Sequence, residues 1–196
     1  MAMDNIMTVR DATQADAEAM LGIYAPYVER TAVTFELEMP SVEEFGERLR
    51  KTQQKYPWLV ADQNGQLLGY AYLGEFKERA AYAHSAETSI YVRMDTHGKG
   101  IGRSLYEALE ERARYIGILN LNACIAYSEM EDEFLTQDSV RFHERMGYVR
   151  CAHFHQCARK FGRWYDMVWM EKLIGEHTDD PAEVKWRDDG DKKTKE

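Results

Sequence analysis

The sequence has 196 residues, of which 44% are hydrophobic and 30% are charged, a composition that fits one folded globular domain and excludes a disordered chain. Its net charge of −9 argues against a nucleic-acid partner, because such a surface needs a basic field. The first residues do not resemble a signal peptide, and no window is apolar enough for a membrane helix. We therefore expect a cytoplasmic protein without a membrane partner.

Three cysteines, Cys124, Cys151 and Cys157, have no CxxC spacing, and their odd number favours reduced thiols. His153 and His155 lie between the last two cysteines, where a zinc site would use them. Both histidines fall in an alternating, strand-like run, however, so we predict that the protein binds no metal.

The first predicted strand covers residues 6–10. Residues 13–16 then pair a threonine with an aspartate three positions later, a pattern that satisfies free amides and opens a helix to about Val28. A second capping box at residues 41–44 opens a helix that stops before Pro57.

Apolar and β-branched runs predict the strands. An Asn64-Gly65 turn joins residues 58–61 and 67–73 into a hairpin, and residues 88–92 form the next strand. The remaining elements are a helix, a strand, a helix and two closing strands, over residues 101–113, 119–127, 139–146, 148–157 and 164–173. This order predicts an α/β domain built on one mixed sheet.

Two segments stand apart from this pattern. Residues 129–133 form an acidic insertion that we predict to be a solvated loop. The segment 175–196 has 13 charged residues among 22 and almost no apolar periodicity, which predicts a poorly ordered tail. Trp186 is the one residue of this tail that could dock on the domain, which we expect to span residues 1–174.

The strongest chemical signal is a glycine loop between a predicted strand and a helix, His97-Gly98-Lys99-Gly100-Ile101-Gly102-Arg103. Glycines let backbone N–H groups approach an anion, and the helix N-terminus and two basic side chains add positive charge. The loop predicts a pyrophosphate site, although its spacing alone leaves open a simple connecting turn. It lacks the Gly-Lys-Ser/Thr of a Walker loop, and its position in mid-chain does not fit a dinucleotide fingerprint.

Together with four other stretches, this loop resembles the acyl-CoA signature of the GNAT superfamily of N-acetyltransferases, with His97 where Gln or Arg is usual. The resemblance is strongest to the phosphinothricin acetyltransferase-like branch and covers residues 7 to about 174; the stretches are residues 31–35, 56–61, 86–92 and 139–148. It implies a GNAT fold, which is a single, mixed, mostly antiparallel and splayed sheet with helices on both faces. It also implies acetyl-CoA as the co-substrate and a homodimer.

The resemblance implies catalytic roles for Glu87 and His143. The Glu87 carboxylate can accept the amine proton, directly or through a water, and the ordinary alternative is a surface acid at a strand end. His143 can donate to the departing thiolate or relay a proton from the amine. The alternative is a histidine that only packs a helix against the sheet.

The predicted contacts to acetyl-CoA lie on one strand, the glycine loop and a later turn. Backbone amides near Ile90 and Val92 are expected to polarise the thioester carbonyl. The turn stands where the family tends to have an Asn that bonds the pantetheine, and neither of its residues is Asn. The full set is Ile90, Tyr91, Val92, His97, Gly98, Lys99, Gly100, Ile101, Gly102, Arg103, Thr136 and Gln137.

The predicted acceptor contacts are Lys77, Arg79 and Tyr82, with Glu87. Arg79 can grip a carboxylate or a phosphinyl oxygen pair, whereas the plain interpretation is a solvated charged loop. The resemblance implies a small primary amine, such as phosphinothricin, methionine sulfone or methionine sulfoximine. A protein N-terminus, a polyamine, an aminoglycoside and a non-catalytic acyl-CoA-binding module stay open. No cysteine has an activated setting, so we expect direct attack in a ternary complex.

Overall fold

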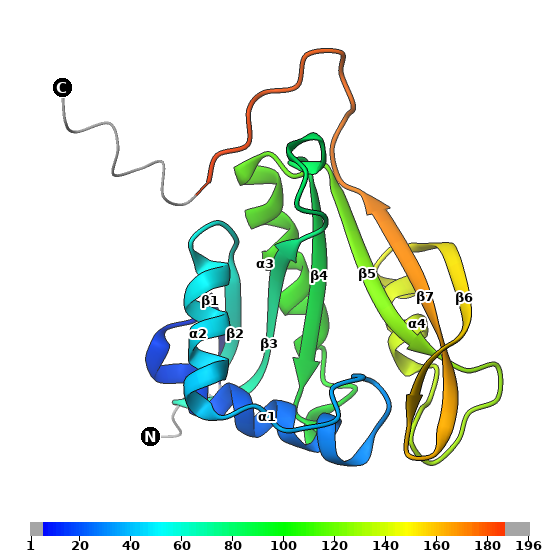
Figure 1. Ribbon diagram of the computed structural model, residues 1–196. Helices are drawn as coiled ribbons and strands as arrows, with labels where there is room; N and C mark the ends of the chain where they lie inside the picture. The colour runs from blue at the N-terminus through cyan, green and yellow to red at the C-terminus, as the bar shows by residue number, and fades with distance from the viewer. Residues whose placement is uncertain (1–5, 187–196) are drawn as a thin grey trace.

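The computed structural model describes residues 6–186, which form one seven-stranded sheet (Figure 1). The strands lie in the order β1-β2-β3-β4-β5-β7-β6. Neighbouring strands are antiparallel except β4 and β5, which are parallel, so the predicted mixed and mostly antiparallel sheet is confirmed. The bounds are β1 Met7–Asp11, β2 Trp58–Gln63, β3 Gln66–Glu75, β4 Ser85–Val92, β5 Asn120–Tyr127, β6 Val149–Lys160 and β7 Arg163–Leu173.

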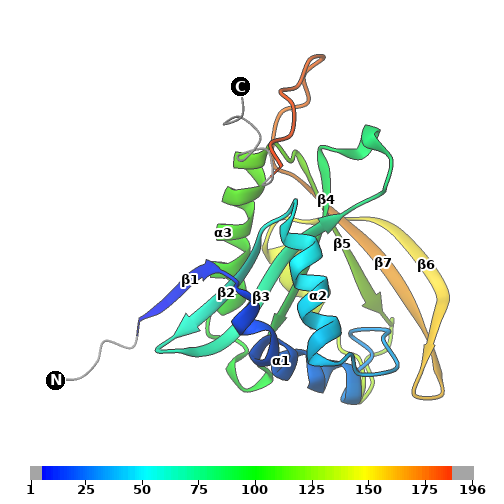
Figure 2. The same ribbon diagram turned by 60° about the vertical axis from the view of Figure 1, so that its left-hand side comes forward.

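Helices cover both faces of the sheet, as Figure 2 shows for α2 and α3. One face carries α1 and α2, whose apolar side chains pack with Trp58 and Tyr70 in one core. The other carries α3 and α4, which share a second core with Leu121 and Val168. No helix within residues 6–186 is long and apolar enough to cross a membrane. The helices are α1 Ala17–Arg30, α2 Val42–Gln53, α3 Ile101–Ile116 and α4 Asp138–Arg145, with 3₁₀ turns η1 Gln14–Asp16, η2 Ala80–Tyr82 and η3 Met94–Thr96.

Both predicted capping patterns form. The Ser41 hydroxyl accepts a hydrogen bond from the Glu44 N–H at 3.1 Å, and the Glu44 carboxylate accepts one from the Ser41 N–H at 2.7 Å. The Asp16 carboxylate likewise accepts from the Thr13 N–H at 2.7 Å. The first helices therefore begin where the sequence predicts, because these oxygens satisfy amides that have no partner inside the helix.

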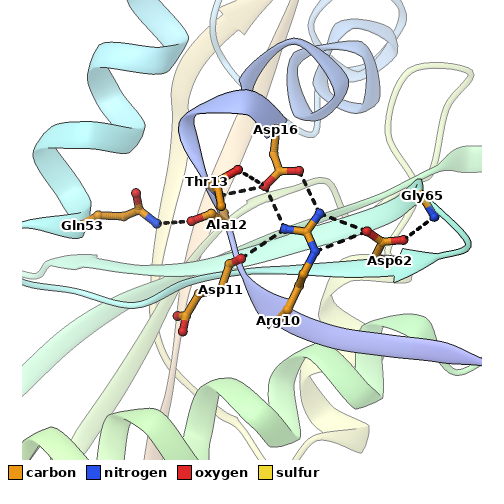
Figure 3. A network of polar contacts seen from close by, with 8 residues as sticks. All are labelled: Arg10, Asp11, Ala12, Thr13, Asp16, Gln53, Asp62 and Gly65. Atoms are coloured by element: carbon orange, nitrogen blue, oxygen red, sulfur yellow. Dashed lines mark hydrogen bonds and ion pairs between the residues drawn. The ribbon is translucent and has the colours of Figure 1, made fainter.

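Arg10 ties edge strand β1 to the two segments beside it (Figure 3). Its guanidinium donates two hydrogen bonds to Asp16, at 2.8 and 2.9 Å, and reaches Asp62 on β2 at 2.9 Å. The hydrogen bonds from Arg10 are the main reason that the pKa of Asp16 falls to about 2. Asp62 also accepts from the Gly65 N–H at 2.7 Å, so the β2–β3 turn belongs to the same network.

The acidic insertion at residues 129–133 is a mostly exposed loop, as predicted, and its half-buried Asp132 carboxylate attaches it to its neighbours. That carboxylate accepts hydrogen bonds from the Phe134 and Leu135 N–H groups, both at 2.8 Å. It also pairs with Arg163 of β7 at 2.8 Å. The sequence hides this arrangement because the cation that fixes the loop comes from a distant strand.

Part of the predicted tail contacts the domain. The Lys185 N–H donates to the Ile116 carbonyl at the end of α3 at 2.9 Å. The Trp186 ring meets the Tyr56 ring edge-on, with centroids 5.3 Å apart, so Trp186 does dock. Residues 187–196 lie outside the described residues, and the prediction of a poorly ordered tail stays a prediction for them.

Candidate active site

The parallel strands β4 and β5 pair over only three residues. The paired positions are Ser85 with Asn120, Ala86 with Leu121 and Glu87 with Asn122. Beyond them β4 pairs with β3 alone and β5 with β7 alone, and Figure 1 shows the two strands diverging towards their C-terminal ends. The sheet is therefore splayed, as the resemblance implies, and the divergence begins directly after Glu87.

The divergence opens an interstrand cleft with a volume of about 50 Å³. The buried polar side chains of His143 from α4 and Tyr106 from α3 reach it from one face of the sheet. The cleft is lined by Val33, Thr88, Ser89, Ile90, Tyr91, Tyr106, Ala123, Cys124, Ile125, Ala126, Leu135, Ser139 and His143. Of these residues, the sequence analysis named Ile90, Tyr91 and His143 as site residues. It did not name Tyr106, because the apolar pattern of the predicted helix gives no sign that a hydroxyl on it faces a cleft.

The backbone of β4 offers donors on its open edge. The Arg93 N–H donates to the Leu68 carbonyl on β3 at 2.9 Å, and N–H direction alternates along a strand. The N–H groups of Ile90 and Val92 therefore point away from β3, as the sequence analysis requires. Tyr91 contributes differently, because its ring packs edge-on against Tyr24 at 4.8 Å on the α1 side.

The glycine loop has the backbone that an anion cradle needs. Gly98 and Gly100 have φ angles of +79° and +82°, which side chains of L-residues rarely adopt. Gly102 is glycine for another reason, since a Cβ there would lie 3.1 Å from the Phe142 ring. Ile101 is buried and begins α3, whose first turn contains no acidic residue that would oppose an anion.

The side chains of the loop divide into two groups. Lys99 and Arg103 are exposed and lie beside the start of α3. His97 is anchored instead: its Nε2 lies 3.0 Å from the Tyr27 hydroxyl and 3.3 Å from the Val92 carbonyl oxygen. The imidazole therefore fastens the loop to α1 and β4, a role that the sequence did not predict for it.

His143 and Tyr106 form a buried polar pair beside the cleft. The Nδ1 of His143 lies 2.7 Å from the Ser139 carbonyl oxygen, which can only accept, so Nδ1 carries the hydrogen. The Nε2 atom then accepts from the Tyr106 hydroxyl at 2.8 Å. Burial lowers the pKa of His143 to about 4 against the smaller opposing effect of the Ser139 bond, so the imidazole is neutral at pH 7.

Glu87 is half-buried at the last paired position of β4 and β5. Burial raises the pKa of its carboxyl, and the positive charge of Lys77 opposes this rise. Cys124 lies nearby on β5, and burial together with the Glu87 charge raises the pKa of its thiol to about 11. Cys124 is therefore a thiol and not a thiolate at neutral pH, and it lacks the activation that a nucleophile needs.

The loop before β4 brings two of the predicted acceptor residues to one aromatic cluster. The Lys77 ammonium lies 5.1 Å from the Phe76 ring centre and 5.6 Å from that of Trp169 on β7. The Tyr82 ring meets Phe76 edge-on at 5.8 Å. Arg79 is exposed and precedes η2, outside this cluster.

The side chains of Thr136 and Gln137 both form hydrogen bonds to residues close by in the sequence. The Thr136 hydroxyl donates to the Asp138 carboxylate at 2.9 Å. The Gln137 side-chain amide donates to the carbonyls of Ser128 and Glu129, at 3.0 and 3.1 Å. These contacts hold the turn between β5 and α4, and neither residue is among the described residues that line the interstrand cleft.

A family model described as "Acetyltransferase (GNAT) domain" matches residues 9–169. The L-amino acid N-acyltransferase MnaT of Escherichia coli (strain K12) is 32% identical over 180 residues, which are 90% of this chain and 99% of that protein. An L-methionine sulfoximine/L-methionine sulfone acetyltransferase of Pseudomonas paraeruginosa is 35% identical over 166 residues, 84% of this chain and 92% of that protein.

A solved structure gives a three-dimensional match. It is a GNAT superfamily phosphinothricin acetyltransferase (Pat) from Sinorhizobium meliloti in complex with AcCoA, with a TM-score of 0.81 and 32% identity. The match covers 90% of this chain and 94% of that one. The similarity therefore extends over most of the chain, and residues 9–169 of the family-model match include the glycine loop.

Proposed function

This chain belongs to the GNAT family of N-acetyltransferases, and from that premise we propose that it acetylates the α-amine of a small amino acid or a close analogue. The observation that carries the proposal is the divergence of β4 from β5 directly after Glu87. It sets a half-buried carboxylate at the branch point, next to Thr88, which lines the cleft. Helix α3, which contributes Tyr106 to the lining, begins at the glycine-rich loop. The relatives named for amino acids and their sulfoximine or sulfone analogues support this acceptor class.

We propose acetyl-CoA as the donor, bound along the α3 and α4 side of the cleft. The residues present fit it, because Gly98 and Gly100 have no Cβ to shield their amides, and α3 begins directly after them at Ile101. Lys99 and Arg103 supply the positive charge that a pyrophosphate requires. The solved relative with AcCoA supports this donor.

Direct transfer suits the groups around the cleft. The amine nitrogen attacks the thioester carbonyl carbon, the carbon–sulfur bond breaks, and Glu87 takes the proton that the nitrogen loses. The N–H groups of Ile90 and Val92 stabilise the developing oxyanion. A free α-amine has a pKa of about 7.7–8, so a carboxylate of raised pKa is a sufficient base.

The departing thiolate is stabilised by a hydrogen-bond donor, and the Tyr106–His143 pair is our candidate for that role. The Nε2 of His143 holds the Tyr106 hydroxyl, so Tyr106 is the group that can turn to the sulfur while His143 orients it. Burial raises the pKa of Tyr106, so the hydroxyl stays protonated and donates a hydrogen bond to the sulfur, while the thiolate takes its proton from solvent. His143 therefore acts through Tyr106 in this proposal, and not as the direct donor that the sequence suggested.

Acceptor recognition is proposed for the loop before β4. Lys77 and Arg79 offer cations for a carboxylate or phosphinyl group, and Tyr82 closes over it. Two cations at this end disfavour an aminoglycoside, which carries positive charge itself. We also propose that the protein is a homodimer with a cytoplasmic location. Sedimentation analysis tests the oligomeric state.

The test is turnover with a panel of amines. The protein is incubated with acetyl-CoA and methionine sulfone, methionine sulfoximine, phosphinothricin, a polyamine, an aminoglycoside or a peptide N-terminus. Because Cys124, Cys151 and Cys157 are free thiols, the acetylated amine is measured by mass spectrometry instead of a thiol reagent. Turnover limited to the amino-acid analogues supports the proposal; preference for another amine overturns the acceptor class.

A further inference from the structure

A group of metal-ligating side chains lies where β6 and β7 pair irregularly. His153 and His155 on β6 and Asp166 on β7 each offer one ligand atom, and these atoms lie within 4.8 Å of one another. None of the three is among the described residues that line the interstrand cleft. The sequence pattern predicted no metal because it considered one strand, and the carboxylate comes from the neighbouring strand.

A bulge in β6 holds the carboxylate. The register with β7 shifts between Phe154 and Ala158, and Gln156 within the bulge has a φ angle of +46°. The Gln156 N–H donates to Oδ1 of Asp166 at 2.7 Å. This contact leaves Oδ2 of Asp166 directed at Nε2 of His153, 2.7 Å away. The backbone thus holds one oxygen of Asp166 in place. Carboxylates that bind metal ions are usually held by such a hydrogen bond.

The two imidazoles are already close. Their ring centroids lie 4.1 Å apart with an interplanar angle of 27°. The His153 ring is held on another side by the edge of Tyr127 at 5.2 Å, whereas His155 is exposed and can turn. Bonds of about 2 Å to one ion place the ligand atoms roughly 3.3 Å apart. The pair of His153 Nε2 and Asp166 Oδ2, now 2.7 Å apart, must therefore open slightly, and rotation of His155 brings its ring nitrogen to the ion.

We propose that His153, His155 and Asp166 bind a zinc-class divalent cation and that the ion clips β6 to β7 across the bulge. Two imidazoles and one carboxylate suit Zn²⁺, Co²⁺ or Ni²⁺, whereas Mg²⁺ and Ca²⁺ prefer all-oxygen sites. The ion replaces the hydrogen bond between His153 and Asp166, and solvent completes its coordination. The partial exposure of these two side chains, 23% and 17%, lets the ion enter without unfolding.

Metal titration of the full, untagged and chelator-stripped chain tests the proposal. We expect Co²⁺ to give visible bands of tetrahedral or five-coordinate geometry, Zn²⁺ to displace it, and Zn²⁺ to raise the Tm. His155→Asn should weaken Co²⁺ binding at least tenfold and abolish the Zn²⁺-dependent rise in Tm. Asp166→Asn should do the same, with circular dichroism confirming that it folds.

The matched control is His177→Asn. His177 is also exposed, and its Nε2 lies 2.7 Å from Asn120 away from the bulge, so this variant should bind Co²⁺ like the parent chain. Equal affinity in His155→Asn and the parent chain would overturn the proposal. So would absence of binding, or a thiolate charge-transfer band, which would assign the metal to the exposed cysteines.

Discussion

The half of the candidate site that we propose for the donor (the donor half) and the half that we propose for the acceptor (the acceptor half) are made of different parts. The donor half consists of backbone amides, two glycines of positive φ and the buried pair Tyr106 and His143, 1% and 3% exposed. The acceptor half consists of side chains on a surface loop, of which Arg79 is exposed and Tyr82 is 41% exposed. Rigid backbone suits a constant ligand, and adjustable side chains suit a variable one. The difference explains why a family can keep its donor while its acceptors change.

Glu87 lies between the two halves, and its loss should have the largest effect. Glu87→Gln keeps the shape but removes the base, so we expect kcat to fall about 10²- to 10⁴-fold. Acetyl-CoA affinity, measured by calorimetry, should change less than twofold. Glu111→Gln, an exposed acid on α3, is the control and should leave kcat unchanged. A normal kcat in Glu87→Gln would remove the base from our mechanism.

The pH profile sharpens this prediction. Because the pKa of Glu87 is raised, the carboxyl takes up a proton as the pH falls, and the parent chain should lose kcat/KM on the acid side. The Glu87→Gln variant has no such group, so its residual rate should lack that acid limb. An acid limb that persists in the variant would belong to another group, the substrate amine included.

The burial of His143 in the donor half can be tested by the pH dependence of the free energy of unfolding. Its pKa is about 6.5 in the unfolded chain and about 4 in the fold, so between these values only the unfolded chain takes up the proton. Folding stability therefore falls as the pH drops from 6.5 to 4, by about 3 kcal/mol from this group.

Urea unfolding at pH 7 and pH 4 measures this dependence, with the parent chain and His143→Gln compared at each pH. The variant loses the Tyr106 contact and should be less stable at pH 7. Its deficit should shrink as the pH falls, because glutamine does not titrate. A deficit that is constant with pH would mean that folding does not lower the pKa of His143, which would contradict its burial away from water.

The local elements of the fold are the part that the sequence predicts well. The glycine loop, the capping boxes and the β-runs are local patterns, and each forms where it was expected. The hydrogen bond between Tyr106 and His143 and the attachment of Asp132 to Arg163 join residues 37 and 31 positions apart, and no local period reveals such pairs. The loop at residues 77–82 has no periodicity at all, so its exposed residues could be named but not arranged.

Glycine substitution separates loop geometry from general strain. Gly100→Ala forces a side chain into a φ of +82°, which costs about 1–2 kcal/mol and should weaken acetyl-CoA binding roughly tenfold. Gly65→Ala is a close match, since Gly65 has a φ of +83° and open space around it, but lies in the β2–β3 turn. It should lower Tm similarly and leave acetyl-CoA affinity unchanged. Equal loss of affinity in both variants would mean that strain, and not the cradle, is responsible.

The smallest effect should come from the acceptor half. Arg79 is exposed and outside the aromatic cluster, so an ion pair with the acceptor contributes only about 1 kcal/mol, and Arg79→Ala should raise the acceptor KM roughly fivefold. Steady-state kinetics should give an unchanged KM for acetyl-CoA, because Arg79 belongs to the acceptor half and not to the donor half. Arg50→Ala, an equally exposed arginine on α2, is the control. A larger change in the acetyl-CoA KM than in the acceptor KM would show that the halves are coupled, and the division between a fixed donor side and an adjustable acceptor side would fail.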